Sequence, residues 1–216
     1  VVFSLFIFNK NQEEAEAGWF NEMWYYRQSS AITNSSSTAV TNQYVKITLD
    51  TSTLITAGKM QSDCDDLRVT SISGELLPFF VDGDTDYTCN DTDTSIWVMA
   101  DNIPTTGSII YIYYGNLTAD NAETNIGNNQ YPAPSCKSIL DHGDSQGDGQ
   151  YYITPTGNKA DQFEVTCDMT NEQGGWTKVY EGLCTSATSV TRTEGNVLEI
   201  SNNIPEISST FPSVLV

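Results

Sequence analysis

Basic residues are scarce in this sequence. Its 216 residues contain 9 Lys and Arg against 28 Asp and Glu, which gives a formal net charge of −19 at pH 7. The stretch from Val69 to Cys136 has acidic residues but no Lys or Arg. Such a chain repels nucleic-acid phosphates and anionic lipid headgroups, so we expect neither as a partner.

The residues and motifs of most metal and catalytic sites are also missing. His142 is the single histidine, and the five cysteines form no C-x-x-C pair, so a zinc site is not expected. In its Gly/Asp-rich surroundings, His142 is most simply a surface residue. The sequence has no G-x-S-x-G motif, phosphate-binding glycine loop or metal-spaced histidine pair, so we expect no enzyme.

The apolar run that opens the chain is too short to cross a bilayer, which takes about 20 residues. Residues 9–17 are mostly good helix formers, and Gly18 is a natural helix stop. We therefore predict a helix over residues 1–17.

Several roles compete for this apolar segment. One is the tail of a signal peptide cleaved after Ala15-Glu16-Ala17, although that site lies far from the apolar run. A second is the end of a helix buried in a filament, as in type IV pilins, although Leu5 stands where bacterial pilins carry glutamate. A third is a donor strand that completes a neighbour's sheet. The plain alternative is packing on its own domain. The assembly roles would bury Val1, Val2, Phe3, Leu5, Phe6, Ile7 and Phe8 between copies.

Elsewhere, short runs of β-branched and aromatic residues alternate with turn residues, which is typical of antiparallel β proteins. Val45, Ile47 and Leu49 alternate with Tyr44, Lys46 and Thr48, the period of a strand with one buried face. We predict a β-sandwich with strands at 26–32, 44–49, 67–71, 75–81, 95–100 and 108–114, and a helical turn or two within 53–60.

The segment from Trp19 to Asn116 resembles a prokaryotic surface domain of unknown function. The match is carried by residues 44–49, 54–60, 76–79 and 109–112 and by Trp24-Tyr25-Tyr26-Arg27, Asp66-Leu67-Arg68, Ile96-Trp97-Val98 and Tyr113-Tyr114-Gly115-Asn116. This resemblance implies a location outside the cell and no activity. Residues 117–134, rich in Asn, Ala and Pro, are predicted to be a linker with little core of its own.

Residues 135–179 resemble the opening of a fibrinogen-like domain. The quoted matches are Ser135 to Leu140, Asp148 to Pro155, Phe163 to Thr170, and Gly174-Gly175-Trp176-Thr177. The resemblance implies an extracellular recognition or structural module with a Cys136–Cys167 bridge. It covers only the family's N-terminal part, so no calcium or ligand residue can be carried over. Glu164 and Asp168, a carboxylate pair on one strand face, belong to this pattern, and we expect them to be structural rather than glycosidic.

The other cysteines suggest one more bridge. Cys64 with Cys89 would tie two loops of the preceding segment, as expected in an oxidising compartment. Cys184 is then left as a free thiol, or its partner lies beyond Val216.

An acidic loop offers the one candidate cation site. Asp82, Asp84, Asp86 and Asp93 are spaced like calcium ligands, but Tyr87 replaces the required glycine. A solvated acidic turn is the preferred interpretation and calcium the alternative, with the same reservation for Asp141, Asp144 and Asp148. Sequons that permit N-glycosylation occur at Asn34, Asn90 and Asn116.

Together these features predict a mainly β extracellular protein of a prokaryotic cell surface. It comprises an apolar assembly segment (1–18), a β-sandwich (19–116), a linker (117–134) and a partial, disulfide-bridged fibrinogen-like module (135–216). The expected function is a pilus-like filament subunit that binds other copies of itself. The alternative is an adhesion module that binds carbohydrate or glycoprotein through exposed aromatics such as Trp19, Trp24 and Tyr113.

Overall fold

The computed structural model describes residues 4–5, 19–84, 87–178, 188–193, 197–202 and 214–215. We call residues 19–116 the N-terminal half, 117–134 the connecting segment and 135–178 the C-terminal half. The described part is mainly β and its sheets are largely antiparallel, as predicted. No described helix is long and apolar enough to span a membrane.

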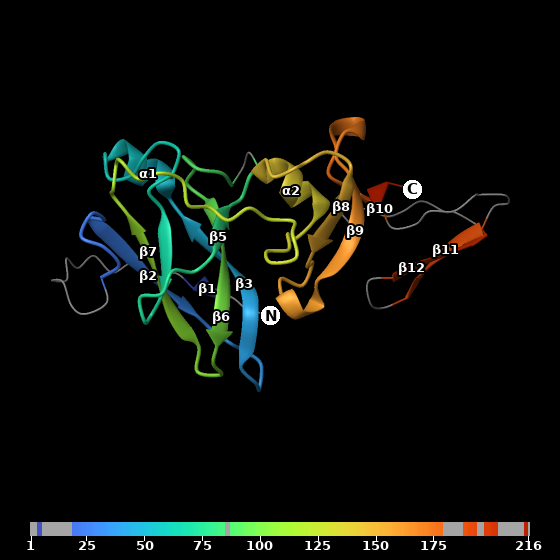
Figure 1. The fold of residues 1–216 in the computed structure, drawn as a ribbon. Helices are drawn as coiled ribbons and strands as arrows, with labels where there is room; N and C mark the ends of the chain where they lie inside the picture. Colours follow the sequence, from blue (N-terminus) through green and yellow to red (C-terminus); the bar gives the residue numbers. More distant parts are fainter. Residues whose placement is uncertain are drawn as a thin grey trace.

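The N-terminal half is built on two antiparallel sheets (Figure 1). Sheet A has the order β1 (Ser4–Leu5), β2 (Tyr26–Ile32), β7 (Ser108–Tyr114) and β4 (Arg68–Ser71). Sheet B has the order β3 (Val40–Leu49), β6 (Thr94–Ile103) and β5 (Phe79–Val81). The short helix α1 (Thr51–Thr56) starts earlier than predicted, because the Asp50 side chain accepts a hydrogen bond from the Thr53 amide and caps it.

Both sheets contribute side chains to one buried cluster. Sheet A supplies Ile32, Ile110 and Ile112, and sheet B supplies Val45, Ile47, Leu49, Ile96 and Val98. We call the faces that join this cluster the inner faces. The predicted alternation in β3 is confirmed on its inner face, but Tyr44 on the outer face is buried too. The outer face of sheet B must therefore be covered.

The C-terminal half combines one helix with a third sheet. Helix α2 (Cys136–His142) is capped by the Ser135 side chain and ends at Gly143, whose φ of 86° favours glycine. Sheet C has the order β13 (Val214–Leu215), β10 (Trp176–Lys178), β9 (Phe163–Asp168) and β8 (Gly149–Ile153). Short 3-10 turns η1 (Lys159–Asp161) and η2 (Asn171–Gln173) flank β9, and β11 (Thr188–Thr193) pairs with β12 (Val197–Asn202).

Both predicted disulfides are present. Cys64 bonds to Cys89, and Cys136 at the start of α2 bonds to Cys167 in β9. The second bridge fixes the helix to sheet C in the middle of a buried cluster. Cys184 lies outside the described residues.

That second cluster joins the two halves. Tyr44, Phe80 and Met99 from the outer face of sheet B pack with α2 and β8 residues that include Ile139 and Tyr151. Figure 1 shows α2 and β8 beside sheet B rather than sheet A. The Tyr44 amide donates a 2.8 Å hydrogen bond to the Gly157 carbonyl, directly across the junction. The C-terminal half thus covers the outer face of sheet B.

The connecting segment is part of this core, contrary to our expectation of a linker with little core of its own. Ile126 and Ala133 are buried in the second cluster. The Thr124 amide donates to the Phe79 carbonyl at 2.7 Å, and Ala133 pairs with Ile153 of β8. The Asn, Ala and Pro content of the segment gave no indication of these contacts, because they depend on only two apolar side chains, Ile126 and Ala133.

At the N-terminus the predicted helix over 1–17 is not supported. Ser4–Leu5 form strand β1, which pairs antiparallel with Ile32 and Ala31 of β2. Backbone pairing with an existing sheet edge replaces the local hydrogen bonds of a helix at these two residues. Val1, Val2, Phe3, Phe6, Ile7 and Phe8 lie outside the described residues, so their expected role in assembly stays a prediction.

Candidate recognition surface

Residues that carry the N-terminal resemblance converge at one end of sheet A. The Trp24 indole Nε1 donates a 2.7 Å hydrogen bond to the Asp66 carbonyl, and the Arg68 guanidinium lies 5.0 Å from the centre of the Trp24 ring. The Asp66 carboxylate accepts hydrogen bonds from the amides of Gly115 at 2.6 Å and Gln61 at 3.1 Å. Three distant segments of the chain, around residues 24, 61–68 and 115, are therefore tied together here.

This cluster of hydrogen bonds around Asp66, which we call the knot, stabilises the structure and is not a reactive site. Burial raises the pKa of Asp66, while the amides of Gly115 and Gln61 partly offset the effect. Arg68 is also committed, because it donates to the carbonyls of Asp65, Leu67 and Asp120. These hydrogen bonds tie the end of sheet A together.

Two aromatic residues that we expected to be exposed are buried instead. Trp24 has an exposed fraction of 7% and Tyr113 of 0%. Trp19 and Phe20 fold over Tyr113, with ring centres 5.5 and 5.9 Å away. Large aromatics with satisfied polar atoms gain more from the core than from water, so Trp24 and Tyr113 cannot serve as free contact residues.

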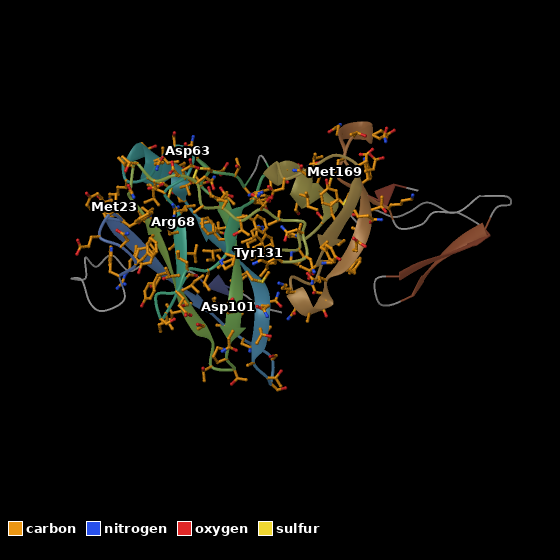
Figure 2. All side chains as sticks on the ribbon, in the orientation of Figure 1. Met23, Asp63, Arg68, Asp101, Tyr131 and Met169 are labelled. Atoms are coloured by element: carbon orange, nitrogen blue, oxygen red, sulfur yellow. A yellow bond between two sulfur atoms is a disulfide. The ribbon has the colours of Figure 1, made fainter. Side chains whose placement is uncertain are left out.

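Exposed apolar and aromatic side chains lie on both sides of Trp24 in the sequence. Met23 is 54% exposed and Tyr25 is 72% exposed. Tyr26 is partly exposed, stacks on Tyr114 with ring centres 5.6 Å apart, and has the Lys59 ammonium 5.3 Å from its ring centre. Figure 2 shows Met23 and Arg68 at the end of the molecule away from Met169. Apolar and aromatic side chains thus face water next to the rigid knot.

The outer face of sheet A continues this surface. The β2–β7 register places Arg27, Ser29 and Ala31 beside Tyr113, Tyr111 and Ile109 on one face. The Arg27 guanidinium lies between the rings of Trp19 and Tyr111, 4.9 and 4.5 Å from their centres. We define the recognition surface as the residues of this face and its adjoining end that reach solvent: Trp19, Met23, Tyr25, Tyr26, Arg27, Ser29, Ala31, Lys59, Ile109 and Tyr111.

The candidate calcium loop does not assemble in the described part of the chain. Asp82 accepts from the Trp97 indole at 3.1 Å and from the Asp84 amide at 3.2 Å. The Asp93 amide donates to Asp91, and Asp86 lies outside the described residues. Among the residues that are described, no three His, Cys, Asp or Glu side chains form a group that could hold a metal ion.

Carboxylates of the C-terminal half stabilise turns. Asp168 accepts from the amide and side chain of Asn171 and from the amide of Thr170, and the Asn171 bonds lower the pKa of Asp168. Asp148 accepts from the Met169 amide at 2.7 Å. These bonds agree with the expected structural role of Asp168, whereas Glu164 is exposed on β9.

The three sequons differ in accessibility. The Asn34 amide nitrogen donates to the carbonyls of Thr38 and Ile103, both at 2.9 Å. Asn116 is buried, whereas Asn90 is exposed in the loop next to Cys89. Asn90 is the sequon best placed for modification.

Sequence reasoning missed the environment of His142. We expected a surface residue, but its side chain is only 11% exposed and lies between Glu123 and Asp144. No short motif links these residues, because Glu123 comes from the connecting segment and meets α2 only after the halves have packed together.

Two family models match parts of the chain. The domain of unknown function DUF2341 matches residues 63–129, and the C-terminal globular domain of fibrinogen beta and gamma chains matches residues 133–188. The chain is thus similar to two families in succession, as the sequence suggested. Asp66, Arg68, Gly115 and α2 lie within the matched ranges, whereas Trp24 and Gln61 precede them. No solved structure matches the chain. The disulfides and the fibrinogen-like segment indicate an extracellular or secreted protein.

Proposed function

We propose that this protein is a non-catalytic recognition module of a prokaryotic cell surface, which binds neutral glycan chains through the outer face and end of a β-sandwich. The observation that carries the proposal is that the outer faces of the two sheets are covered to different extents. The C-terminal half covers the outer face of sheet B, while Tyr25 and Tyr26 are exposed at the end of sheet A and Ile109 on its outer face. Rigid rings beside polar groups suit a ligand that has both apolar and hydroxyl faces.

Charge favours a neutral ligand. The net charge of −19 repels acidic polysaccharides over the whole surface. Arg27 and Lys59, the cations of the recognition surface, lie over the rings of Trp19, Tyr111 and Tyr26. They orient the aromatic platform and are poorly placed to select an anion.

The proposal predicts a loss of binding when the exposed rings are removed. Tyr25→Ala with Tyr26→Ala should weaken binding to a neutral oligosaccharide by about tenfold or more, because buried aromatic anchors dominate such contacts. An array of neutral, sialylated and uronate-bearing oligosaccharides would select the probe, and calorimetry would give the affinity.

Tyr87→Ala is the matched control. Tyr87 is also exposed and also has a lysine, Lys46, over its ring, but it lies beside sheet B. We expect this variant to bind like the unmodified protein. Binding restricted to acidic glycans, or equal losses in both variants, would contradict the proposed surface.

Assembly into a filament is a second candidate, and one observation favours it. Strand β1 adds to the edge of sheet A, yet it pairs only with Ala31 and Ile32 of β2. The same pairing made by a neighbour's N-terminal segment would link copies without new contacts, which is the logic of strand exchange. The proposal that copies of this chain bind one another rests on this strand exchange.

Engineered cysteines distinguish pairing within a chain from pairing between chains. Leu5 and Ala31 are opposite each other in the β1–β2 register, so Leu5→Cys with Ala31→Cys should oxidise to a disulfide. Both changes are made in a Cys184→Ser background. Assembly by strand exchange predicts covalent dimers and longer chains on non-reducing gels, whereas monomers with an internal bridge would contradict it and leave the recognition module unaffected.

A further inference from the structure

His142, the last residue of α2, touches all three parts of the chain. Its Nε2 is 2.9 Å from Oε2 of Glu123 in the connecting segment, and its Nδ1 is 2.8 Å from Oδ2 of Asp144. The ring also packs edge-on against Phe80 of β5, with centres 5.5 Å apart. The imidazole therefore lies where the halves meet.

The two carboxylates hold backbone amides with the same oxygens. Oε2 of Glu123 accepts from the Val81 amide at 2.7 Å, and Oδ2 of Asp144 accepts from the Ile126 amide at 2.6 Å. Bonds from amides favour ionised carboxylates. With both ionised, each ring nitrogen of His142 must donate, and only the imidazolium has two N–H groups.

We propose that His142 is a proton-dependent clasp that holds the connecting segment and the C-terminal half against sheet B. When the ring loses one proton, a nitrogen lone pair faces a carboxylate oxygen at hydrogen-bond distance. That contact becomes repulsive, so Glu123 or Asp144 turns away and weakens its bond to the Val81 or Ile126 amide. The clasp is closed in the protonated form and loosened in the neutral form.

Other charged groups around the clasp support the protonated form. On α2 itself, Asp141 is paired with Lys137. The loop after β5 brings Gly83 so close that a Cβ there would lie 2.1 Å from the Asp141 carbonyl oxygen, and it carries Asp82 and Asp84. The carboxylate of Glu123 also interacts with that of Asp65. Apart from Lys137, these neighbours are acidic and favour a cationic ring.

The direction of the pH effect follows from these contacts. Burial alone would lower the pKa of His142, but the hydrogen bonds and charges of Glu123 and Asp144 outweigh it, and the pKa is raised above 6.5. The stabilisation is therefore complete below pH 6.5 and is lost as pH rises through the raised pKa. A pKa raised by one unit corresponds to about a tenfold change in the closing equilibrium.

Nuclear magnetic resonance on the full chain tests the clasp directly, because His142 is the only histidine and its ring proton signal is unambiguous. We expect a His142 pKa above 6.5. After correction for intrinsic pH dependence, hydrogen exchange at the Val81 and Ile126 amides should rise as pH increases, with the same midpoint as the ring titration. Amides in the β3–β6 ladder should not follow it.

Two variants separate the clasp from general electrostatics. Glu123→Gln should lower the pKa of His142 and the exchange midpoint together, whereas Asp141→Asn removes a nearby charge that pairs with Lys137 and should leave the coupling in place. A His142 pKa at or below 6.5 in the unmodified protein overturns the proposal. Exchange at the Val81 and Ile126 amides that does not change as His142 titrates would also overturn it. If a variant fails to fold, the His142 pKa and the amide exchange of the unmodified protein still test the proposal. Neither measurement depends on what the recognition surface binds.

Discussion

Replacing Phe80 with alanine should lower the free energy of unfolding by about 3–5 kcal/mol, the largest effect that we expect from a single substitution. Phe80 is 2% exposed and lies in the second core cluster. Its ring meets Tyr44 at 5.6 Å, Trp97 at 6.3 Å and His142 at 5.5 Å between centres. The substitution would leave a cavity in the cluster that joins the two halves.

Urea unfolding followed by tryptophan fluorescence and by far-UV circular dichroism measures this loss. Phe163→Ala is the control, because Phe163 in β9 is 38% exposed and should cost far less. We also expect the Phe80→Ala transition to broaden or split, since the halves would no longer unfold together. A loss below about 1 kcal/mol would mean that the halves are stable without their common core.

Removal of the Cys136–Cys167 bridge should have the second largest effect. Its sequence separation of 31 residues predicts a loss of about 3–4 kcal/mol from the greater freedom of the unfolded chain. Both cysteines are fully buried in the second cluster, so the double change to serine also places two hydroxyls in an apolar site.

The measurement compares Cys136→Ser with Cys167→Ser against a parent that carries Cys184→Ser, which removes thiol exchange from both proteins. Cys136→Ala with Cys167→Ala separates the chain-entropy effect from the buried hydroxyls. We expect the alanine pair to recover only part of the loss. Unfolding midpoints in urea that match the parent would show that α2 is held to β9 by packing alone.

Local patterns predicted much of the fold. The alternation in residues 44–49 placed the inner face of β3 correctly. Both expected bridges are present, although Cys136–Cys167 was implied by the fibrinogen-like resemblance rather than by a local pattern. Burial of Tyr44 was not predictable, because it depends on side chains of α2 and β8, which are far from it in the sequence. An alternating pattern indicates that one face of a strand is buried. It does not indicate whether a second layer covers the other face.

The candidate site was also predictable only in part, because distant contacts decide which of its residues are exposed. Trp19, Trp24 and Tyr113 are large aromatics near the resemblance motifs, and composition alone made them candidates for exposure. Burial of Trp24 follows from the Asp66 carbonyl that receives its indole N–H, a contact between positions 42 residues apart. The exposed residues Met23 and Tyr25 flank it, where a turn closed by the Trp24 amide and the Asn21 carbonyl leads toward β2.

The measurement that tests the recognition surface most directly is amide chemical-shift mapping of the full chain with a neutral oligosaccharide selected on the array. We predict that the shifts change at Tyr25, Arg27, Ser29 and Tyr111, along the outer face of sheet A, and remain constant in β8 and β9. Changes confined to β8 and β9, or no change with any neutral oligosaccharide at millimolar concentration, would contradict the account.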